Sequence, residues 1–537
     1  MVHRKHAVIV RRLTLTPMIF WLWSFVAAAQ SLDNFSERMQ KITSRPEFAH
    51  AHFGIEFYSL DSGKVLYRVN SDKLMVPGST AKLLTEGTIL ELLGGDYRFH
   101  TRVYRTGSIN KHGKLDGDLV LVASGDPNLS GRIQPDGTLG YENQDHSYGG
   151  PDSKGLGDPL FVIREITDQI AGKGIKHIAG KVLVDATLFP EGDRELGTNV
   201  VISPIVVNDN VIDVIATAGA KKDDPVTLQV SPKTSYLQII NQATTAEAGS
   251  KSSLSLSDEK MDAEGMRSAT LTGTLAAGTN SGMIAYAVPE PSQFAATLLT
   301  EALRAKGIAI SPGRAGAAVN FKDLAAKYVP EDVLAEHVSP PLREEVKITL
   351  KVSQNLHASM APFLLGALVA HKDKEISQAG FDQEQQFLKK AGLDLTAACQ
   401  SDGAGGNAFF TADFIVRYLT FMANQKDFND FHRGLPILGQ DGTLHKIQVR
   451  SSAAGHVQAK TGTYVTYDAL NRKLMVNGKG LAGYMQTRNG QHLAFAAYVN
   501  MVEVPLDDPE AAQKIAGEAL GEIAAAAYDA TFETGSR

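Results

Sequence analysis

The stretch Ser79-Thr80-Ala81-Lys82 places a serine and a lysine three positions apart at the start of a predicted helix. Pro77-Gly78 ends the extended segment before it, and residues 80–93 have an amphipathic helical pattern that stops at Gly94-Gly95. Residues three apart on a helix share a face, so Lys82 can reach the Ser79 hydroxyl. A lysine with a depressed pKa can act as the base that activates a serine. The stretch therefore predicts a serine nucleophile at Ser79 with Lys82 as its general base.

An S-x-x-K pattern is weak evidence alone, because Ser108/Lys111 and Ser257/Lys260 also match it in polar, turn-like surroundings. The structural alternative is that Ser79 only caps the helix and Lys82 lies on the surface. The free N–H groups and positive potential of a helix N-terminus would, however, favour a developing oxyanion at Ser79. Two further motifs are needed to decide.

One of them is Lys460-Thr461-Gly462-Thr463, which follows the alternating strand segment 456–459 and contains the one K-T-G of the chain. Lys460 and the Thr461 and Thr463 hydroxyls could hold a carboxylate, and Gly462 would let a substrate backbone approach closely. The strand N–H groups could pair with an extended acyl chain.

The other is Ser353-Gln354-Asn355, between helical segments of the region 342–372, where a hydroxyl and an amide could project into a cleft. Ser108-Ile109-Asn110 also matches S-x-N, so this motif too is weak alone. The three motifs in the order S-x-x-K, S-x-N and K-T-G, each in its expected context, are a strong signal for serine acyl transfer.

At these residues the sequence resembles the penicillin-recognising serine acyl-transfer enzymes. The 270 residues between Lys82 and Ser353 make it similar to one branch, the D-alanyl-D-alanine carboxypeptidase/endopeptidase family of low-molecular-mass class C penicillin-binding proteins (peptidase family S13). Four further segments add to the resemblance: Gly125-Asp126-Pro127-Asn128-Leu129, Val184-Asp185, Ser401-Asp402-Gly403-Ala404-Gly405 and Leu481-Ala482-Gly483-Tyr484.

The resemblance implies an α/β (α+β) fold, in which a penicillin-binding-protein/β-lactamase-like serine transferase domain is interrupted by β-rich inserted domains. The transferase domain would be an antiparallel sheet with helices on both faces. It also implies a serine DD-peptidase that acts on peptidoglycan stem peptides through an acyl-enzyme and is inhibited by penicillin. Its partners would be peptidoglycan peptides and β-lactam antibiotics, and no metal or organic cofactor is implied.

The resemblance gives the first two motifs their roles. Ser79 would attack the D-Ala-D-Ala carbonyl, with Lys82 as general base. Ser353 would relay a proton to the leaving D-alanine amine, and Asn355 would orient Lys82 and the substrate amide.

The third motif would bind the substrate. Lys460 would support the electrostatics, and Thr461 and Thr463 would bind the terminal carboxylate. The backbone N–H groups of Ser79 and Thr463 would form the oxyanion hole. Asp185 is a candidate for binding the amine of a diaminopimelate side chain, and the alternative is that it only caps a turn.

Two positions depart from the family pattern. The connection 464–480 is longer than expected, and Ala404 stands where the family's D-G-S-G segment has serine, so no hydroxyl role can be transferred there.

Helix–strand elements at both ends and a β-rich middle predict one domain with a large insertion, although consecutive independent domains would have the same composition. The predicted boundaries are 30–97 and 325–537 for the catalytic domain, 98–195 and 280–324 for inserted domain II, and 196–279 for inserted domain III. Local patterns predict a hairpin at 54–70 and strands at 118–123, 181–189 and 226–231. They also predict helices at 160–173, 291–306 and 508–531, and a polar loop at 244–262.

The composition of the 537 residues excludes several classes of protein. A net charge of −6 argues against a nucleic-acid partner, which would need a basic surface. The single cysteine, Cys399, excludes an internal disulfide and a cysteine-based metal site, and we interpret it as a bystander.

Residues 1–29 have the pattern of an export signal. Four basic residues precede the apolar run 18–26, and Ala27-Ala28-Ala29 resembles a cleavage site. The alternative is a membrane anchor, for which the apolar run is short. Removal of the signal would leave 49 basic and 59 acidic residues, a net charge of −10, on an exported enzyme of the periplasm or cell envelope.

Two other functions are compatible with the serine motifs. The first is a β-lactamase or esterase, although no E-x-x-L-N segment offers a deacylating glutamate. The second is a catalytically silent penicillin-binding module of the cell wall, which would not need Lys82, Ser353 and Lys460 together.

Overall fold

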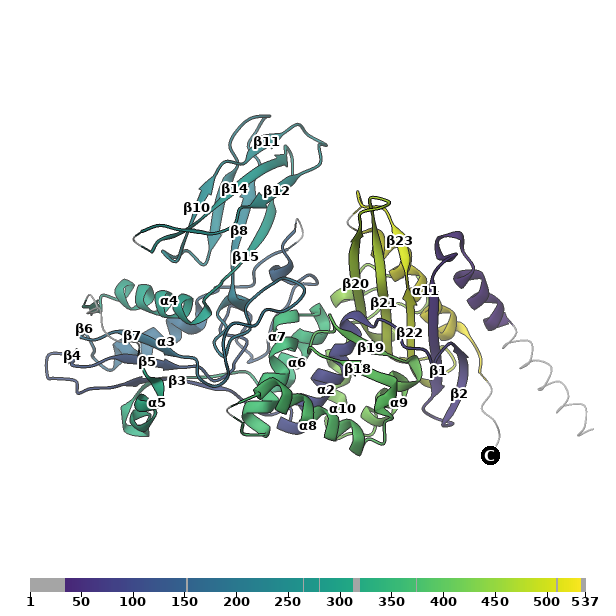
Figure 1. Ribbon diagram of the computed structural model, residues 1–537, viewed down its shortest axis with the longest axis horizontal. Helices are drawn as coiled ribbons and strands as arrows, with labels where there is room; N and C mark the ends of the chain where they lie inside the picture. Colours follow the sequence, from purple (N-terminus) through teal and green to yellow (C-terminus); the bar gives the residue numbers. More distant parts are fainter. Residues whose placement is uncertain are drawn as a thin grey trace, which may run out of the picture.

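The structure is a computed structural model that describes residues 34–150, 153–263, 265–279, 281–311, 319–372, 374–508 and 510–532. The predicted export signal lies outside these residues. Within the described ranges, no helix combines the length and the apolar character needed to cross a bilayer. Figure 1 shows a large sheet with helices packed against it, a smaller α/β body beside it, and a further small sheet projecting from that body.

The large sheet is built from both ends of the chain. Its strand order is β2-β1-β22-β21-β20, with β23 paired to β21, and its strand pairs are antiparallel. The strands are β1 (His52–Ser59), β2 (Lys64–Val69), β20 (Val457–Asp468), β21 (Lys473–Gln486), β22 (His492–Asn500) and β23 (Val502–Val504). The predicted hairpin at 54–70 and the predicted antiparallel sheet are both confirmed.

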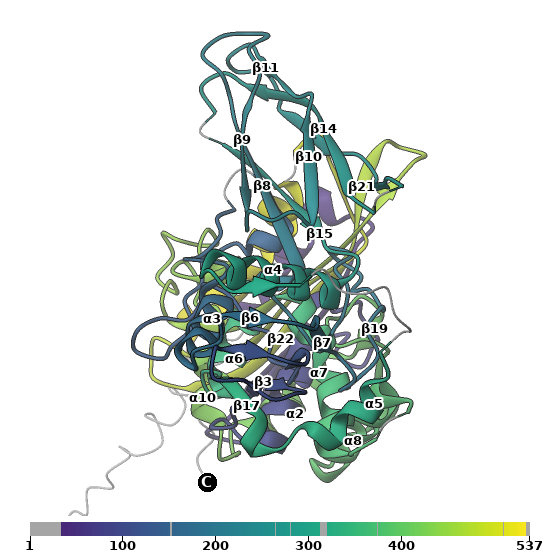
Figure 2. The same ribbon diagram turned by 90° about the vertical axis from the view of Figure 1, so that its left-hand side faces the viewer.

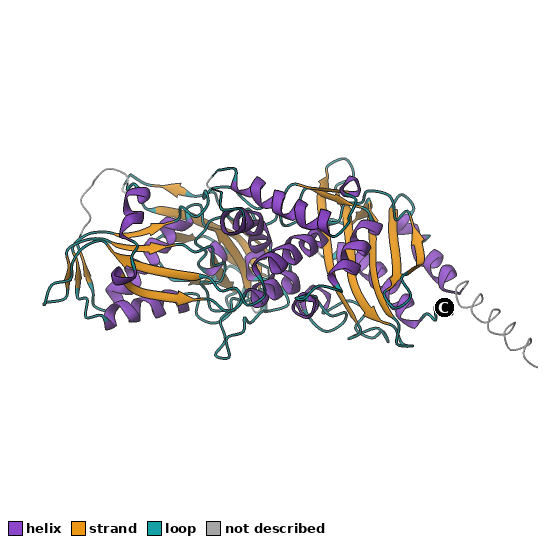
Figure 3. Ribbon diagram, turned by 90° about the horizontal axis from the view of Figure 1, so that it is seen from below, coloured by secondary structure: helices purple, strands orange, loops and turns teal. Residues whose placement is uncertain are grey.

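Both faces of this sheet are buried, as β22 shows most clearly. Leu493, Phe495 and Ala497 contact the core on one face, whereas Ala494 and Ala496 contact the core on the other. Because successive side chains of a strand point to opposite faces, this continuous apolar run is the pattern of a central strand covered on both sides. Helices accordingly lie on both faces (Figure 3).

One face carries the helices that hold the first two motifs. They are α2 (Lys82–Leu93), α6 (Leu342–Val352), α7 (Asn355–Leu364), α8 (Ile376–Lys390), α9 (Ala412–Met422) and α10 (Phe428–Gly434). The expectation that α2 is amphipathic was wrong, because every residue from Lys82 to Leu90 is buried. The other helices surround it, and Gly87 leaves room for the Tyr418 hydroxyl, which would lie 1.9 Å from an added Cβ. The helix ends, as predicted, at Gly94 (φ 90°).

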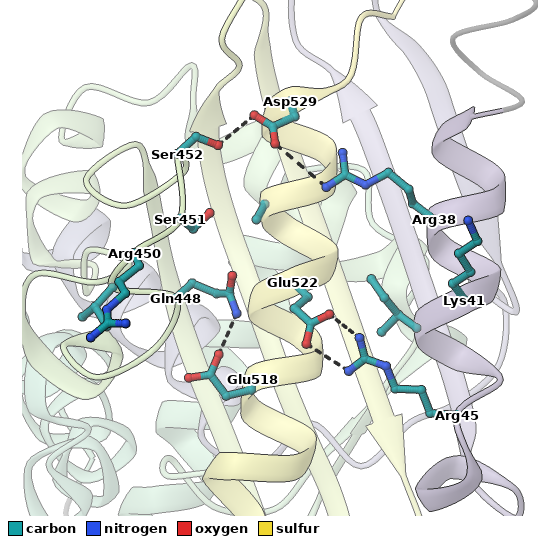
Figure 4. Close-up of a pocket in the computed structure, with 13 residues that line it drawn as sticks. Arg38, Lys41, Arg45, Gln448, Arg450, Ser451, Ser452, Glu518, Glu522 and Asp529 are labelled. Atoms are coloured by element: carbon teal, nitrogen blue, oxygen red, sulfur yellow. Dashed lines mark hydrogen bonds and ion pairs between the residues drawn. The ribbon is translucent and has the colours of Figure 1, made fainter.

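The other face joins the two ends of the chain. A helix at residues 34–43 and α11 (Glu518–Asp529) pack there, and their side chains form a polar groove (Figure 4). Arg45 forms an ion pair with Glu522, and Arg38 with Asp529. The predicted helix 508–531 is present from residue 511 to residue 529, with a π-helical turn at Gln513–Gly517 before α11.

The smaller body has a four-stranded sheet, in the order β17-β3-β5-β7, with two helices packed on it. Its elements are β3 (His100–Arg105), β5 (Leu119–Val122), β7 (Val182–Asp185), β17 (Val333–Val338), α3 (Phe161–Gly172) and α4 (Pro291–Ala305). The helices confirm the predictions at 160–173 and 291–306.

The projecting body contains the strands between β7 and α4. They are β8 (Val211–Thr217), β9 (Thr227–Ser231), β10 (Leu237–Asn241), β11 (Thr244–Ala246), β12 (Ser253–Leu256), β13 (Lys260–Met261), β14 (Arg267–Ala276) and β15 (Gly282–Ala287). The predicted loop at 244–262 was wrong, since it contains β11, β12 and β13, all paired with β14. Leu254 and Leu256 alternate with exposed serines and pack on a small core, so the polar composition belongs to a solvated strand face.

Candidate active site

The fold brings all three motifs to one place. Ser79 lies in a 3₁₀ turn, Gly78–Ala81, that runs into α2, and the S-x-N motif links α6 to α7. Lys460 and the residues that follow it lie on β20, the edge strand of the large sheet next to that turn.

The Lys82 amine is at the centre of the site. Its Nζ atom donates to Ser79 Oγ at 2.8 Å and to Asn355 Oδ1 at 2.7 Å, and lies 3.5 Å from Ser353 Oγ. A fourth contact, at 3.2 Å, goes to the carbonyl oxygen of Ala404. The side chain of Lys82 is fully buried. The alternative in which Lys82 is a surface lysine is therefore wrong.

Burial lowers the pKa of Lys82 from 10.5 to about 7, although the carboxylates of Glu195, Asp402 and Glu86 act in the opposite direction. We expected burial and the charge of Lys460 to lower this pKa; the direction is confirmed, and burial is its largest cause. An amine with this pKa is partly neutral at physiological pH and can accept a proton.

Lys460 also contacts Ser353, the serine that lies 3.5 Å from the Lys82 amine. Its Nζ donates to Ser353 Oγ at 2.9 Å and to the Thr461 carbonyl at 2.9 Å. Burial, followed by the neighbouring Lys82 and Lys479, holds the pKa of Lys460 well below its usual value. Ser353 has a left-handed backbone (φ 63°) at the end of α6, which is rare for a residue with a side chain.

Two glycines let β20 lie against the nucleophile turn. A Cβ on Gly462 would lie 1.9 Å from the Pro77 carbonyl oxygen, and one on Gly78 would lie 2.6 Å from the Thr463 nitrogen. Gly462 is therefore explained by the packing of β20 on this turn. Its missing side chain allows close packing of β20 on the turn, whereas we had expected it to make room for a substrate backbone. This packing places the Thr463 N–H beside the Ser79 turn.

A third lysine, Lys479, contacts β20 from the adjacent strand β21. Lys479 on β21 is paired in register with Thr463, and its Nζ donates to Thr463 Oγ1 at 2.7 Å and to Gln513 Oε1 at 2.6 Å. Burial lowers its pKa to about 8. Thr461 Oγ1 in turn lies 2.7 Å from Thr443 Oγ1. No motif points to Lys479, because it is the strand register that places it beside Thr463.

Ser79, Ser353, Asn355, Thr461, Thr463 and Lys479 face one cleft of about 570 Å³. It is lined by Ser79, Asn143, Gln144, Asp145, Tyr148, Gly197, Val352, Ser353, Asn355, Thr443, His445, Lys446, Thr461, Thr463, Lys479, Glu510 and Gln513. Most of these residues have polar side chains, and they come from both the large-sheet body and the segment inserted between β3 and β17.

The sequence matches the D-Ala-D-Ala carboxypeptidase 3 (S13) family over residues 35–520. The chain belongs to this family. It is 26% identical over 497 residues to a D-alanyl-D-alanine carboxypeptidase of an Actinomadura species, with 88% of this chain and 82% of that protein covered. It is 24% identical to the D-alanyl-D-alanine carboxypeptidase DacB of Haemophilus influenzae, with 76% and 77% covered.

The fold is also that of a solved relative. The crystal structure of penicillin binding protein 4 (dacB) from Haemophilus influenzae is similar, with a TM-score of 0.69, 20% identity and coverage of 92% of this chain and 98% of that one. A complex of the same protein with a β-lactam matches with a TM-score of 0.64 and 21% identity, covering 91% and 98%. The predicted penicillin-binding-protein-like fold is confirmed.

One departure from the family pattern is Ala404 in the D-G-S-G segment, and this residue still contacts the site through its backbone. The Ala404 carbonyl accepts from Lys82. Asp402 holds the loop, because its Oδ1 accepts the backbone N–H groups of Ala404, Gly405 and Gly406. The loop therefore contacts Lys82 without a side-chain hydroxyl.

The second departure, the connection 464–480, is a continuation of two strands. β20 extends to Asp468 and β21 begins at Lys473, so the segment forms a hairpin ribbon with a register shift after Tyr464. Leu470 at its tip is 90% exposed. In Figure 2 this ribbon extends to the same side of the molecule as the projecting body.

Asp185 lies at the end of β7 and is buried. Its Oδ1 accepts from the Thr187 N–H at 3.0 Å and the Thr187 hydroxyl at 2.7 Å, and its Oδ2 accepts from the Tyr328 hydroxyl at 2.7 Å. These contacts are those of a residue that caps a turn, and Asp185 does not line the Ser79 cleft.

Proposed function

We propose that the protein is a serine DD-peptidase that cleaves D-Ala-D-Ala stem peptides of peptidoglycan through an acyl-enzyme at Ser79. The observation that carries this proposal is the buried Lys82 amine, which has a pKa of about 7 and lies 2.8 Å from Ser79 Oγ. Membership of the S13 family supports the choice of substrate.

In the first step, Ser79 Oγ attacks the carbonyl carbon of the penultimate D-alanine while Lys82 takes the hydroxyl proton. The N–H groups of Ser79 and Thr463 hold the oxyanion. Collapse of the intermediate breaks the C–N bond, and the proton passes through Ser353, between Lys82 and Lys460, to the leaving amine. Water then attacks the ester, with Lys82 again as base, and releases the shortened peptide.

The substrate carboxylate would be held by Thr461 and Thr463, with Lys479 as a supporting cation. At neutral pH an amine with a pKa of about 8 is mostly protonated, which suits a carboxylate partner. Asn355 would keep Lys82 directed at Ser79, as their 2.7 Å hydrogen bond supports.

The competing functions are less well supported. A silent binding module would have no use for two fully buried lysines, which are costly to maintain. A β-lactamase or esterase would share the acylation step. It can be distinguished from a peptidase only by which substrate the enzyme hydrolyses.

Mass spectrometry after treatment with penicillin tests the nucleophile: one covalent adduct is expected, and Ser79→Ala should remove it. Digestion of purified muropeptides then tests the substrate. Loss of a single D-alanine would indicate a carboxypeptidase, and split cross-links an endopeptidase. If penicillin acylates Ser79 but every muropeptide stays intact, the peptidase proposal is wrong.

We further propose that the enzyme is exported to the periplasm or cell envelope after removal of residues 1–29. We also propose the domain boundaries given above, with the smaller body as inserted domain II and the projecting body as inserted domain III. N-terminal sequencing of the protein isolated from cells would test the first point, and limited proteolysis near residues 196 and 279 the second.

A further inference from the structure

A buried cluster of charged side chains lies behind the S-x-N motif, between α7 and the inserted segment. Asp209 is at its centre. Its Oδ2 accepts from Arg132 Nη2 at 2.5 Å and from His146 Nε2 at 2.7 Å, and its Oδ1 accepts from His357 Nε2 at 2.9 Å. Asp209 has no exposed surface, and its three partners are at most 6% exposed.

The backbone around Asp209 is unusual. Asn208, Asp209 and Asn210 each have a φ of 52°, a left-handed conformation that residues with side chains rarely adopt. The two asparagines stabilise it locally, since Asn208 Nδ2 donates to the Val211 carbonyl and Asn210 Nδ2 to the Ile205 carbonyl. Such strain persists where the surroundings hold it in place, and it is concentrated at functional sites. Here it turns one carboxylate into the interior.

One path of contacts leads from Asp209 to the middle residue of the S-x-N motif. The Arg132 nitrogen that binds Asp209 also donates to Asp145 Oδ2 at 2.5 Å. Asp145 Oδ1 accepts from Gln354 Nε2 at 3.0 Å. The other end of the Gln354 amide accepts the N–H of Leu356 and so caps α7.

A second path runs through α7 itself. His357, two residues after Asn355, contacts Asp209 with Nε2 and Glu345 on α6 with Nδ1, at 2.9 Å in both cases. One imidazole therefore connects the two helices on either side of the S-x-N motif to the inserted segment.

The cluster contains three basic side chains and four carboxyl groups. The carboxylates beside His146 and His357 raise the pKa of both to about 10, so both are cations together with Arg132. The facing anions are Asp145, Asp209, Asp213 and Glu345. The carboxylates of Asp145 and Asp209 share Arg132, whose charge offsets part of theirs.

We propose that Asp209 is a positioning residue for acyl transfer, because it holds Ser353 and Asn355 beside Lys82. It does so along the two paths described above: the first runs through Arg132, Asp145 and Gln354, and the second through His357. This inference rests on the proposed function. Ser353 Oγ must stay between two amines, 3.5 Å from Lys82 and 2.9 Å from Lys460, and Asn355 Oδ1 must stay 2.7 Å from Lys82. Displacements of about 1 Å in such sites cost about 100-fold in rate.

The test is Asp209→Asn, which keeps the size of the side chain and removes its charge. Stopped-flow acylation by a penicillin separates the dissociation constant of the first complex from the rate constant of acylation. We expect the rate constant to fall by about 10- to 100-fold and the dissociation constant to change by less than about 3-fold. A purely structural role would lower the fraction of active protein and leave the rate constant of that fraction unchanged.

The matched control is His337→Gln. His337 is also a buried histidine paired with a carboxylate, Glu165 at 2.7 Å, but it makes no hydrogen bond to residues 353–355 in the described chain. It should retain the wild-type acylation rate constant. If Asp209→Asn does not fold, Gln354→Glu takes its place, because it keeps the α7 cap and repels Asp145, and the same fall is expected.

Each result has one meaning. A wild-type rate constant in the folded variant, or an equal fall in His337→Gln, overturns the inference. If the wild-type protein is not acylated at all, the proposed function fails first.

Discussion

Lys82 and Lys460 direct their amines at the same oxygen: Ser353 Oγ lies 3.5 Å from one Nζ and 2.9 Å from the other. Two adjacent ammonium groups would repel each other, and both side chains are fully buried, so solvent screens the repulsion little. Burial lowers the pKa of both. Ser353 Oγ therefore lies where the proposed proton relay needs it, between the two amines.

The first prediction concerns the pH dependence of acylation. Lys82 must be neutral to accept the Ser79 proton, and its pKa is lowered from 10.5 to about 7. The acylation rate should rise about tenfold per pH unit below pH 7 and become constant above it. Stopped-flow measurements with penicillin between pH 5 and 10 check this, and a rate that still rises near pH 10 would contradict it. The variant Lys479→Met removes another amine and should leave the midpoint unchanged.

The second prediction concerns the contact between β20 and the nucleophile turn. Gly462→Ala would place a methyl group 1.9 Å from the Pro77 carbonyl oxygen, so the strand must move away and take the Thr463 N–H with it. Loss of one oxyanion donor costs about 100- to 1,000-fold in rate, and we expect that loss in acylation.

The control is Gly172→Ala at the end of α3, where an added Cβ meets no atom within 4 Å. It should acylate at the wild-type rate. Normal acylation by Gly462→Ala would show that β20 does not need this close packing.

The third prediction concerns Lys479. Lys479→Met removes the amine that donates to Thr463 Oγ1, and a charged hydrogen bond is worth about 1.5–3 kcal/mol. The KM for a peptide with a free terminal carboxylate should rise about 10- to 100-fold, with kcat changed much less. Steady-state release of D-alanine measures both constants. Lys473→Met, on the same strand but paired with Glu503 at the surface, should change neither.

The fourth prediction concerns stability. Glu384 on α8 is buried, and burial alone raises its pKa from 4.5 to about 8. The folded protein holds this proton up to about pH 8 and the unfolded chain releases it near pH 4.5, so stability is lost as the pH rises between the two. Glu384→Gln should remove that loss, which amounts to about 1.4 kcal/mol per pH unit.

Urea unfolding of the wild type and the variant at pH 5 and pH 8 measures the difference. Glu331 is exposed, so Glu331→Gln should change the free energy of unfolding by the same amount at pH 5 and at pH 8. If Glu384→Gln does so too, its carboxyl is not buried as a neutral acid.

Much of the site could be predicted because its chemistry depends on short motifs. The order of Ser79/Lys82, Ser353/Asn355 and Lys460 along the chain identified residues that the structure brings together. Lys479, Asp209 and the contact of the Ala404 carbonyl with Lys82 could not be found in this way. Lys479 acts across a strand pair, Ala404 acts through its carbonyl, and Asp209 acts through buried partners far away in the sequence.

The fold was predictable where one pattern determined one element. The hairpin at 54–70 and the helices at 160–173 and 291–306 depend on local periodicity, and they are present. The predictions failed where the surroundings decide. α2 is covered on all sides, so its polar residues do not mark a solvent face, and the serine-rich strands β11 to β13 are stabilised by pairing with β14.

The pairing of β1 with β22 has a consequence for the order in which the chain is made. Residues 52–59 leave the ribosome more than 430 residues before their partners at 492–500. The central sheet therefore stays incomplete until residue 500 has been made, and the Ser79 turn lacks β20 until residue 468 has been made. A nascent or truncated chain cannot attack a wall peptide, so biosynthesis itself delays the appearance of hydrolytic activity.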